Sequence, residues 1–247
     1  MSTGNLIKLA HDRALYQGHL ANTAWHRHGA PVLLVGLGRG FRVHLADGRV
    51  EHAQSALLDA NQAHILESNG EPVASLFLEP DAPETQALRH TYLNREACVF
   101  DLVPAPTTGS RLERRIQSLD LETVLARSLR NTHHKPLDAR IVQTLKALRS
   151  APGIRPVRSQ LAAQAGLSAS RFNHLFSEQM GICFRRYRLW AQVRAGLMHL
   201  RPHARLTDLA HDTGFADSAH FSRTFRDLFG LPPSAVLKDL KTLEHIS

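Results

Sequence analysis

The chain has 247 residues, of which 43% are hydrophobic and 21% charged, with 15 glycines and 12 prolines. This composition is typical of a folded protein with one or two domains and excludes disordered and fibrous classes. The longest apolar run, residues 31–37, is far shorter than the roughly 20 residues of a membrane-spanning helix. We therefore expect a cytoplasmic protein without a membrane segment. Cys98 and Cys183 fit neither a disulfide framework nor a metal-binding spacing, so both are predicted to be reduced and buried.

The net charge of +8 is unevenly distributed along the chain. Residues 1–105 carry 8 Lys/Arg and 11 Asp/Glu, residues 106–135 carry 6 and 3, and residues 136–247 carry 16 and 8. The basic excess therefore lies entirely after residue 105. This asymmetry favours contact between the back half and a polyanion such as nucleic acid, although a solvated basic surface would have the same charge.

Residues 24–78 consist of short β-rich pieces separated by turn residues. Strands at about ten-residue spacing favour an antiparallel barrel or sandwich over alternating strands and helices. One hairpin is expected, in which the strand Phe41–Leu45 is followed by the turn residues Asp47 and Gly48.

After a linker at residues 104–109 the hydrophobic pattern becomes helical and is predicted to stay helical to the end of the chain. Two apolar stripes follow the linker, on one helix or on two short ones. They consist of Leu112, Ile116 and Leu119, and then of Leu121, Val124, Leu125 and Leu129. A further helix is expected over residues 137–148, behind Pro136.

The strongest signal is an internal repeat in the back half. The segment Leu161-Ala162-(x)3-Gly166-Leu167 recurs 48 residues later as Leu209-Ala210-(x)3-Gly214-Phe215, and Phe172, Phe176 and Gly181 recur 49 residues later as Phe221, Phe225 and Gly230. Each copy predicts a short helix, a turn at the glycine, an N-cap at Ser168 or Asp217, and a longer amphipathic helix. This is the helix-turn-helix pattern, written twice.

Residues 184–200 lie between the copies and are predicted to form one connecting helix about 25 Å long. A rigid connector of that length can hold two reading helices about one DNA turn apart, so that one chain reads two adjacent major grooves.

The double motif, the connecting helix and the closing run from Gly214 to Pro233 resemble the AraC/XylS family of bacterial transcription regulators. The resemblance covers about residues 136–240 and implies a seven-helix DNA-binding domain with two recognition helices. It also implies a cupin-like N-terminal sensor domain and dimerisation through helices in between. Matched to the family pattern, the base-facing residues are Ser170, Asn173, His174, Ala219, His220 and Arg223. Arg186 is a candidate phosphate contact.

Three histidines in the front half are candidate effector or metal ligands. His26 and His28 share one face of a predicted strand, and His64 occupies a place where cupins often have another inward histidine. They can hydrogen-bond an organic effector, bind a divalent metal, or be structural histidines without a ligand. Residues 30–33 lack the glutamate that normally continues the cupin metal pattern. His44 and His52 are weaker candidates, because a lone strand histidine is usually structural.

The sequence thus predicts an α+β protein with an antiparallel cupin-like β-barrel over residues 1–105, a linker and dimerisation helices over 106–135, and an all-α DNA-binding domain with two helix-turn-helix motifs over 136–247. Expected partners are promoter DNA, a small-molecule or metal effector, RNA polymerase and a second copy of the chain. No catalytic residue is predicted. The alternatives are a cupin-type metal-dependent enzyme fused to a DNA-binding module, and a constitutive DNA-binding protein whose barrel is an inert platform. Activation and repression are both left open.

Overall fold

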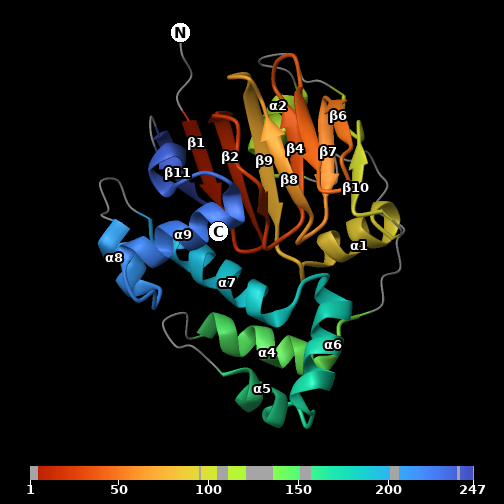
Figure 1. Ribbon diagram of the computed structural model, residues 1–247, viewed down its shortest axis with the longest axis vertical. Helices are drawn as coiled ribbons and strands as arrows, with labels where there is room; N and C mark the ends of the chain where they lie inside the picture. Colours follow the sequence, from red (N-terminus) through yellow and green to blue (C-terminus); the bar gives the residue numbers. More distant parts are fainter. Residues whose placement is uncertain are drawn as a thin grey trace. The chain divides into compact units, whose positions relative to one another are not determined.

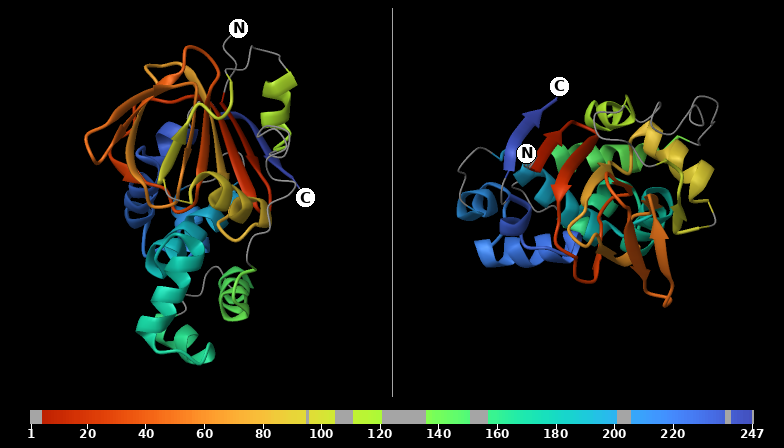
Figure 2. Two further views of the ribbon diagram at one scale, coloured as in Figure 1. Left: turned by 90° about the vertical axis from the view of Figure 1, so that its right-hand side faces the viewer. Right: turned by 90° about the horizontal axis from the view of Figure 1, so that it is seen from above.

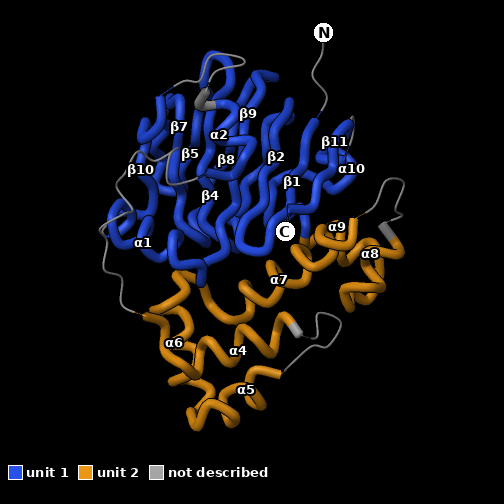
Figure 3. The backbone as a smooth tube through the Cα atoms, turned by 180° about the vertical axis from the view of Figure 1, so that it is seen from behind, with its two compact units in different colours: residues 1–134, 225–247 blue, residues 135–224 orange. Residues whose placement is uncertain are grey.

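The computed structural model describes residues 5–94, 96–104, 111–120, 136–150, 157–200, 206–237 and 240–246. The chain divides into two compact units (Figure 3): unit 1 is Met1–His134 with Phe225–Ser247, and unit 2 is Lys135–Thr224. The division falls inside helix α9 (Ser218–Phe229), whose residues from Phe225 onward belong to unit 1. In this division, residues 225–247 of the DNA-binding domain expected over residues 136–247 fall in unit 1.

Unit 1 is built on two β-sheets (Figure 1). The seven-stranded sheet has the strand order β10-β7-β4-β9-β2-β1-β11, and the four-stranded sheet has the order β3-β8-β5-β6. The strands are β1 (Asn5–Leu9), β2 (Arg13–His19), β3 (His26–Arg27), β4 (Val32–Gly36), β5 (Phe41–Leu45), β6 (Val50–Ala53), β7 (Ser55–Leu58), β8 (Ala63–Glu67), β9 (Pro72–Leu78), β10 (Cys98–Phe100) and β11 (Leu240–His245). The β-rich character of the front half is confirmed, but the two sheets are not closed into the predicted cupin-like barrel.

The predicted hairpin is present as β5 and β6, which pair in antiparallel register. Gly48 has a φ of +90°, a conformation that glycine adopts without the steric cost of a side chain. Its N–H donates to the carbonyl of Leu45 at 3.0 Å, and the Leu45 N–H donates to the carbonyl of Arg49 at 2.8 Å. Local turn chemistry therefore fixes the register of this pair.

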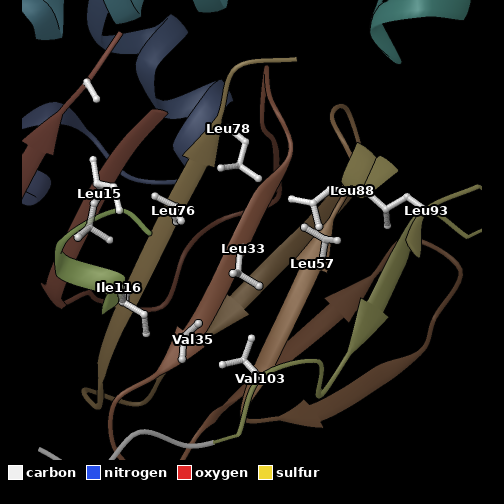
Figure 4. Packing of buried hydrophobic residues seen from close by; sticks show 13 residues of the cluster. Leu15, Leu33, Val35, Leu57, Leu76, Leu78, Leu88, Leu93, Val103 and Ile116 are labelled. Carbon is white, nitrogen blue, oxygen red and sulfur yellow. The ribbon is translucent and has the colours of Figure 1, made fainter. Parts of the chain in front are cut away.

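Helices α1 (Pro83–Tyr92) and α2 (Arg111–Gln117) pack on the seven-stranded sheet, and α2 lies beside β1 and β2 in Figure 2. The core between them contains Leu15, Leu76 and Ile116, which lie together in Figure 4. The remaining buried members of this core are Ala10, Leu33, Val35, Leu57, Ala74, Leu78, Leu88, Leu93, Val103 and Leu119.

The first apolar stripe was predicted to contribute to a dimer contact, and this is wrong for Ile116 and Leu119. Ile116 is 1% and Leu119 6% exposed, and both pack in the core of their own unit. Their apolar side chains are covered by the sheet and leave nothing on that face for a partner. The side chain of Leu112 and the second stripe, residues 121–129, lie outside the described residues.

Strand β11 corrects the prediction of helix to the end of the chain. It pairs in parallel with β1, and Lys8 Nζ lies 2.8 Å from Glu244 Oε2. Its partner is at the opposite end of the chain, so no local pattern could indicate the pairing. The prediction of two buried thiols is also only half right, because Cys98 is buried but Cys183 is exposed.

Unit 2 is helical within its described residues. Its helices are α4 (Ala139–Ser150), α5 (Arg158–Gln164), α6 (Ala169–Met180), α7 (Phe184–Met198), α8 (Leu206–Asp212) and the first part of α9. A short helix α10 (Pro233–Leu237) follows in unit 1. Among the described helices, none has the length and hydropathy to cross a membrane.

Candidate DNA-binding surface and histidine cluster

The two predicted helix-turn-helix motifs have matching backbone hydrogen bonds. In the first, the N–H groups of Gly166 and Leu167 donate to the carbonyls of Ala163 and Ala162, at 3.0 and 2.9 Å. In the second, the N–H groups of Gly214 and Phe215 donate to the carbonyls of His211 and Ala210, at 3.0 and 2.8 Å. Both glycines have positive φ, +65° and +74°, which ends α5 and α8 in the same left-handed turn. The repeat in the sequence is therefore a repeat of local structure.

The caps of the longer helices are repeated as well. Ser168 Oγ accepts a hydrogen bond from Arg171 N at 3.3 Å, and Asp217 Oδ1 accepts one from His220 N at 2.6 Å. Each bond satisfies one of the backbone donors that a helix start leaves unpaired. Both predicted N-caps are thus confirmed, for α6 and α9 respectively.

Aromatic side chains seat helix α6 against α7. Phe172 and Phe176 are fully buried, and the ring of each lies 5.4 Å from the ring of Phe184, centroid to centroid. The Phe176 ring also lies 5.5 Å from that of Tyr187. These contacts fix the roll of α6 and direct its other face outward.

The N-terminal part of α9 is seated by a different set of contacts. Phe221 is 1% exposed and its ring lies 5.3 Å from that of Phe215. Gly196 allows α7 to lie close to Thr213, because a Cβ added at Gly196 would lie 3.2 Å from Thr213 Cγ2. Gln192 of α7 donates to the Thr213 carbonyl at 3.2 Å.

Most of the predicted base-facing residues lie on the outward faces of α6 and α9. Ser170, His174, Ala219 and Arg223 are exposed, and Asn173 is half-buried. The ring of His220 is half-buried and lies edge-on to that of Phe215, with 5.1 Å between the ring centroids. The predicted phosphate contact, Arg186, is also half-buried on α7.

The three predicted histidine ligands come together in unit 1. His26 in β3 and His64 in β8 are paired across the four-stranded sheet, and His28 follows β3 directly. Their side chains are buried, with 4%, 1% and 5% exposure for His26, His64 and His28. One ring nitrogen from each residue lies within 4.8 Å of those of the other two. The weaker candidates, His44 and His52, are not part of this cluster.

Each histidine of the cluster has its Nδ1 beside a backbone carbonyl oxygen. The distances are 2.9 Å from His26 to Ala24, 3.0 Å from His64 to Gln62, and 2.7 Å from His28 to Leu228. A carbonyl oxygen only accepts, so each Nδ1 carries the proton and donates.

The other ring nitrogen of each histidine is Nε2. Nε2 of His26 lies 3.3 Å from Nε2 of His28, and Nε2 of His64 is buried without a hydrogen-bond partner. Burial and the neighbouring His26 lower the pKa of His64 to about 3, so this ring is neutral near pH 7. A neutral imidazole with an unprotonated Nε2 is the form of histidine that binds transition metals.

The chain was also compared with known proteins. A sequence model of the helix-turn-helix domain family matches residues 161–239. No curated protein matches the chain in sequence. The family match spans both repeats of the motif described above, including the two glycine turns and the connecting helix.

Solved structures of ToxT from Vibrio cholerae share the fold. A ligand-free variant from strain SCE256 has a TM-score of 0.64 at 12% identity, covering 93% of this chain and 98% of that chain. Wild-type ToxT from the same strain, bound to an unsaturated fatty acid, has a TM-score of 0.61 at 13% identity, covering 98% of each chain. ToxT from strain O395, bound to (E)-4-(8-methylnaphthalen-1-yl)but-3-enoic acid, has a TM-score of 0.60 at 8% identity, covering 95% and 98%. At these identities the likeness concerns the fold, a β-rich N-terminal part followed by a helical helix-turn-helix part.

Proposed function

We propose, from the premise that this chain carries an AraC-type helix-turn-helix domain, that it is a sequence-specific DNA-binding regulator of transcription. The observation that carries the proposal is the repeated motif, in which the glycine turns, N-caps and buried phenylalanines recur in both copies. Each copy presents an exposed, polar helix face of the kind that enters a major groove. Such a regulator acts where the genome lies, in the bacterial cytoplasm.

In this proposal α6 and α9 read adjacent major grooves. The base contacts come from Ser170, Asn173 and His174 on α6, and from Ala219, His220 and Arg223 on α9. Arg223 has the greatest discriminating power, because an exposed guanidinium can bind guanine O6 and N7 together. Arg186 contributes a phosphate contact, which adds affinity without sequence preference.

The test is selection of binding sites from random duplex DNA, with the full-length chain. We expect Arg223→Ala to cost about 1–3 kcal/mol of binding free energy and to relax preference at one base position. Binding should also weaken steeply with salt, since phosphate contacts release counterions. Arg226→Ala is the matched control, because it removes the same charge from an exposed position one turn further along α9. If Arg223→Ala selects the wild-type motif unchanged, α9 is not the reading helix.

We further propose that unit 1 binds an effector at His26, His28 and His64, either a small organic molecule or a metal ion. The effector would act by population shift, favouring the state that contacts RNA polymerase or occupies the promoter. We also propose that the chain forms a homodimer through residues 121–129. Light scattering of the purified chain measures its oligomeric state directly. Replacement of both His26 and His28 by Ala should abolish the transcriptional response to the effector.

A second candidate function, a metal-dependent enzyme fused to a DNA-binding module, is favoured by the convergence of the three histidines alone. Three protein ligands leave a coordination position open to substrate, as in catalytic zinc sites. Turnover of cupin-type substrates by metal-loaded protein would support this function. A metal content of one ion per chain without any turnover would support the regulator instead.

A further inference from the structure

The histidine cluster is connected directly to the end of the second recognition helix. The ring of His28 donates through Nδ1 to the carbonyl of Leu228, which lies in the last turn of α9. The last four carbonyls of a helix have no partner within it, so this bond caps the C-terminus of α9. Nε2 of the same ring lies 3.3 Å from Nε2 of His26. His28 therefore joins α9 to the cluster through its two nitrogens.

A second contact holds the backbone just after α9 against the residues that precede β3. The N–H of Ala24 donates to the carbonyl of Gly230 at 3.0 Å. Gly230 has a φ of +73°, and an added Cβ there would lie 2.7 Å from His26 Nδ1 and 2.9 Å from the Ala24 carbonyl. No side chain fits in this space, so the backbone after α9 lies directly against residues 24–26.

The cluster has the geometry and chemistry of a transition-metal site. Two nitrogens at 2.0–2.1 Å from a tetrahedral zinc ion are about 3.3 Å apart, which agrees with the 3.3 Å between Nε2 of His26 and of His28. The orphaned Nε2 of His64 supplies the third donor. A backbone carbonyl on every Nδ1 is the usual outer support of metal-bound histidines, since it fixes the tautomer and orients the ring.

The surroundings of the cluster select among metals. Three imidazole ligands favour zinc and neighbouring late transition metals, whereas magnesium and calcium need oxygen ligands. Phe77 lies edge-on to His28 at 5.0 Å, and Phe229 of α9 lies 6.0 Å from it. These rings give the site an apolar wall, part of which α9 itself provides.

We propose that His26, His28 and His64 bind a zinc-like divalent ion, and that this ion fastens the C-terminal turn of α9 to residues 24–28 of the same unit. A metal on Nε2 makes the His28 ring more positive, which strengthens its hydrogen bond to Leu228 and its attraction to the negative end of the α9 dipole. By linkage, the docked state of α9 must bind the ion more tightly than the undocked state. Metal occupancy is thereby coupled to the helix that carries His220 and Arg223.

The metal site is tested first, on the full-length chain freed of metal by a chelator. In a zinc titration in competition with a chromophoric chelator, the chain should bind one zinc ion. Cobalt bound to the chain should give the visible absorption of a nitrogen-ligated ion. His64→Gln should weaken zinc on the order of a hundredfold or more. His52→Gln is the matched control, an exposed histidine of the same unit that should leave the affinity unchanged. Equal zinc affinities of wild type and His64→Gln would overturn the site.

The fastening of α9 is tested by amide hydrogen exchange with and without zinc. The amide of Ala24 is the direct reporter, because it donates across the contact to Gly230. We expect zinc to slow exchange at Ala24 and over residues 225–230 on the order of tenfold in wild type and not in His64→Gln. Gly230→Ala keeps all three ligands, and should nevertheless weaken zinc binding because it opens the contact. Tight zinc binding with unchanged exchange over residues 225–230 would overturn the fastening.

The last arm rests on the proposed function, because it measures DNA binding. With a duplex obtained by site selection, zinc should change the wild-type Kd fivefold or more and leave that of His64→Gln unchanged. Tight DNA binding with a Kd that zinc does not change would refute the coupling between metal binding and DNA binding. The proposed function would stand. Absence of DNA binding in every condition would refute the proposed function, and the titration and exchange results would still decide the metal site.

Discussion

Ser168 and Asp217 perform the same function with different chemistry, at the starts of the two recognition helices. The hydroxyl of Ser168 is neutral, whereas the carboxylate of Asp217 adds a negative charge where the helix dipole is positive. Its bond is also the shorter of the two, 2.6 Å against 3.3 Å. The second motif therefore depends more strongly on its cap than the first.

Asp217→Ala should lower the free energy of unfolding by about 0.5–2 kcal/mol, the usual cost of a lost N-cap. Urea denaturation followed by circular dichroism measures the change. Glu178→Ala removes the same charge from an exposed position near the C-terminal end of α6, away from the cap, and serves as the control. The assignment of the cap fails if the two variants are equally stable.

Several residues could be placed from the sequence because their signal is local. The glycines at 166 and 214 and the caps at 168 and 217 follow from spacing alone, since each turn is closed by neighbours in the chain. The half-buried state of His220 could not be predicted in this way. Its ring contacts Phe215, and nothing in the periodicity of α9 shows on which side of the helix that ring lies.

At the level of elements, Arg13 connects three parts of unit 1. From β2 it donates to the Leu119 carbonyl after α2 at 2.9 Å, and its Nη2 lies 3.6 Å from Glu84 in α1. Asp12 orients this guanidinium by two hydrogen bonds, one of them at 2.9 Å. Leu119 has a φ of +60°, unusual for leucine, and the bond from Arg13 helps to hold it there.

The Asp12–Arg13 pair should make unit 1 sensitive to acid. The hydrogen bond from Arg13 holds the pKa of Asp12 below its ordinary range. Because the folded-state pKa is below the unfolded one, the pair stabilises fully above about pH 4 and loses its effect as pH falls through the folded pKa.

Asp12→Asn should therefore be less stable than wild type at pH 6, with the difference shrinking as the pH is lowered below about 4. Thermal unfolding over a pH series measures it. Asp47→Asn is the control, because its pair with Arg49 is open to solvent and should contribute little. A stability difference that stays constant over the whole pH series would contradict the assignment.

Ile116→Ala should cost about 2–5 kcal/mol of unfolding free energy, the usual range for a large side chain removed from a core. Ile116 is 1% exposed among Leu15 and Leu76, so its loss leaves a cavity under α2. Ser118→Ala, at an exposed position just after the helix, should change stability little. If Ile116→Ala instead gives a stable monomer from a dimer, this face of α2 is an interface and not core.

Elements with internal signals were predictable, and elements defined by distant partners were not. The hairpin β5–β6 and the helices α6, α7 and α9 follow from turns, caps and periodicity within each segment. Helix α1 was not predicted, although Pro83 at its start and Arg89 in its last turn are recognisable boundary signals. Strand β11 has no such signal, because its hydrogen bonds go to β1.

At the level of the whole molecule, the chain first forms most of unit 1 and then unit 2, and residues 225–247 again belong to unit 1. The change in hydrophobic pattern along the sequence correctly separates a β-rich front from a helical back. Residues 225–247 carry three Lys/Arg and three Asp/Glu, so the basic excess lies before them, but a neutral composition does not show that they pack with the front half. The return of the chain to unit 1 places the histidine cluster beside Leu228, a contact between residues 200 positions apart.

Because unit 1 contains residues from both ends of the chain, the chain cannot be divided into its two units at a single position. The fragment 136–247 would lack residues that its last part packs with, because Phe225 and Leu228, which are 2% and 0% exposed in the whole chain, belong to unit 1. Without the N-terminal residues, the cap on the Leu228 carbonyl and the cover of this turn are lost. DNA-binding measurements on the full-length chain are therefore the more direct test of the proposed function.

Strand β11 should contribute to the stability of unit 1. Deletion of residues 240–247 should lower the unfolding temperature by several degrees, at about 2–4 °C per kcal/mol for a chain of this size. It removes the whole ladder between β11 and β1, including the bond from Ile246 N to the Leu9 carbonyl at 2.8 Å. It also leaves β1 as an open edge, which favours aggregation.

Glu244→Gln is the matched control for that deletion, because it removes only the ion pair with Lys8, in which Glu244 is 46% exposed. It should cost less than about 1 kcal/mol, since solvent screens such a pair. Calorimetry of the deletion, the control and wild type compares the three directly. An unfolding temperature unchanged by the deletion would mean that β11 adds nothing to unit 1. The fold of the front half would then be complete without the end of the chain, and the fastening of α9 would depend on residues 225–230 alone.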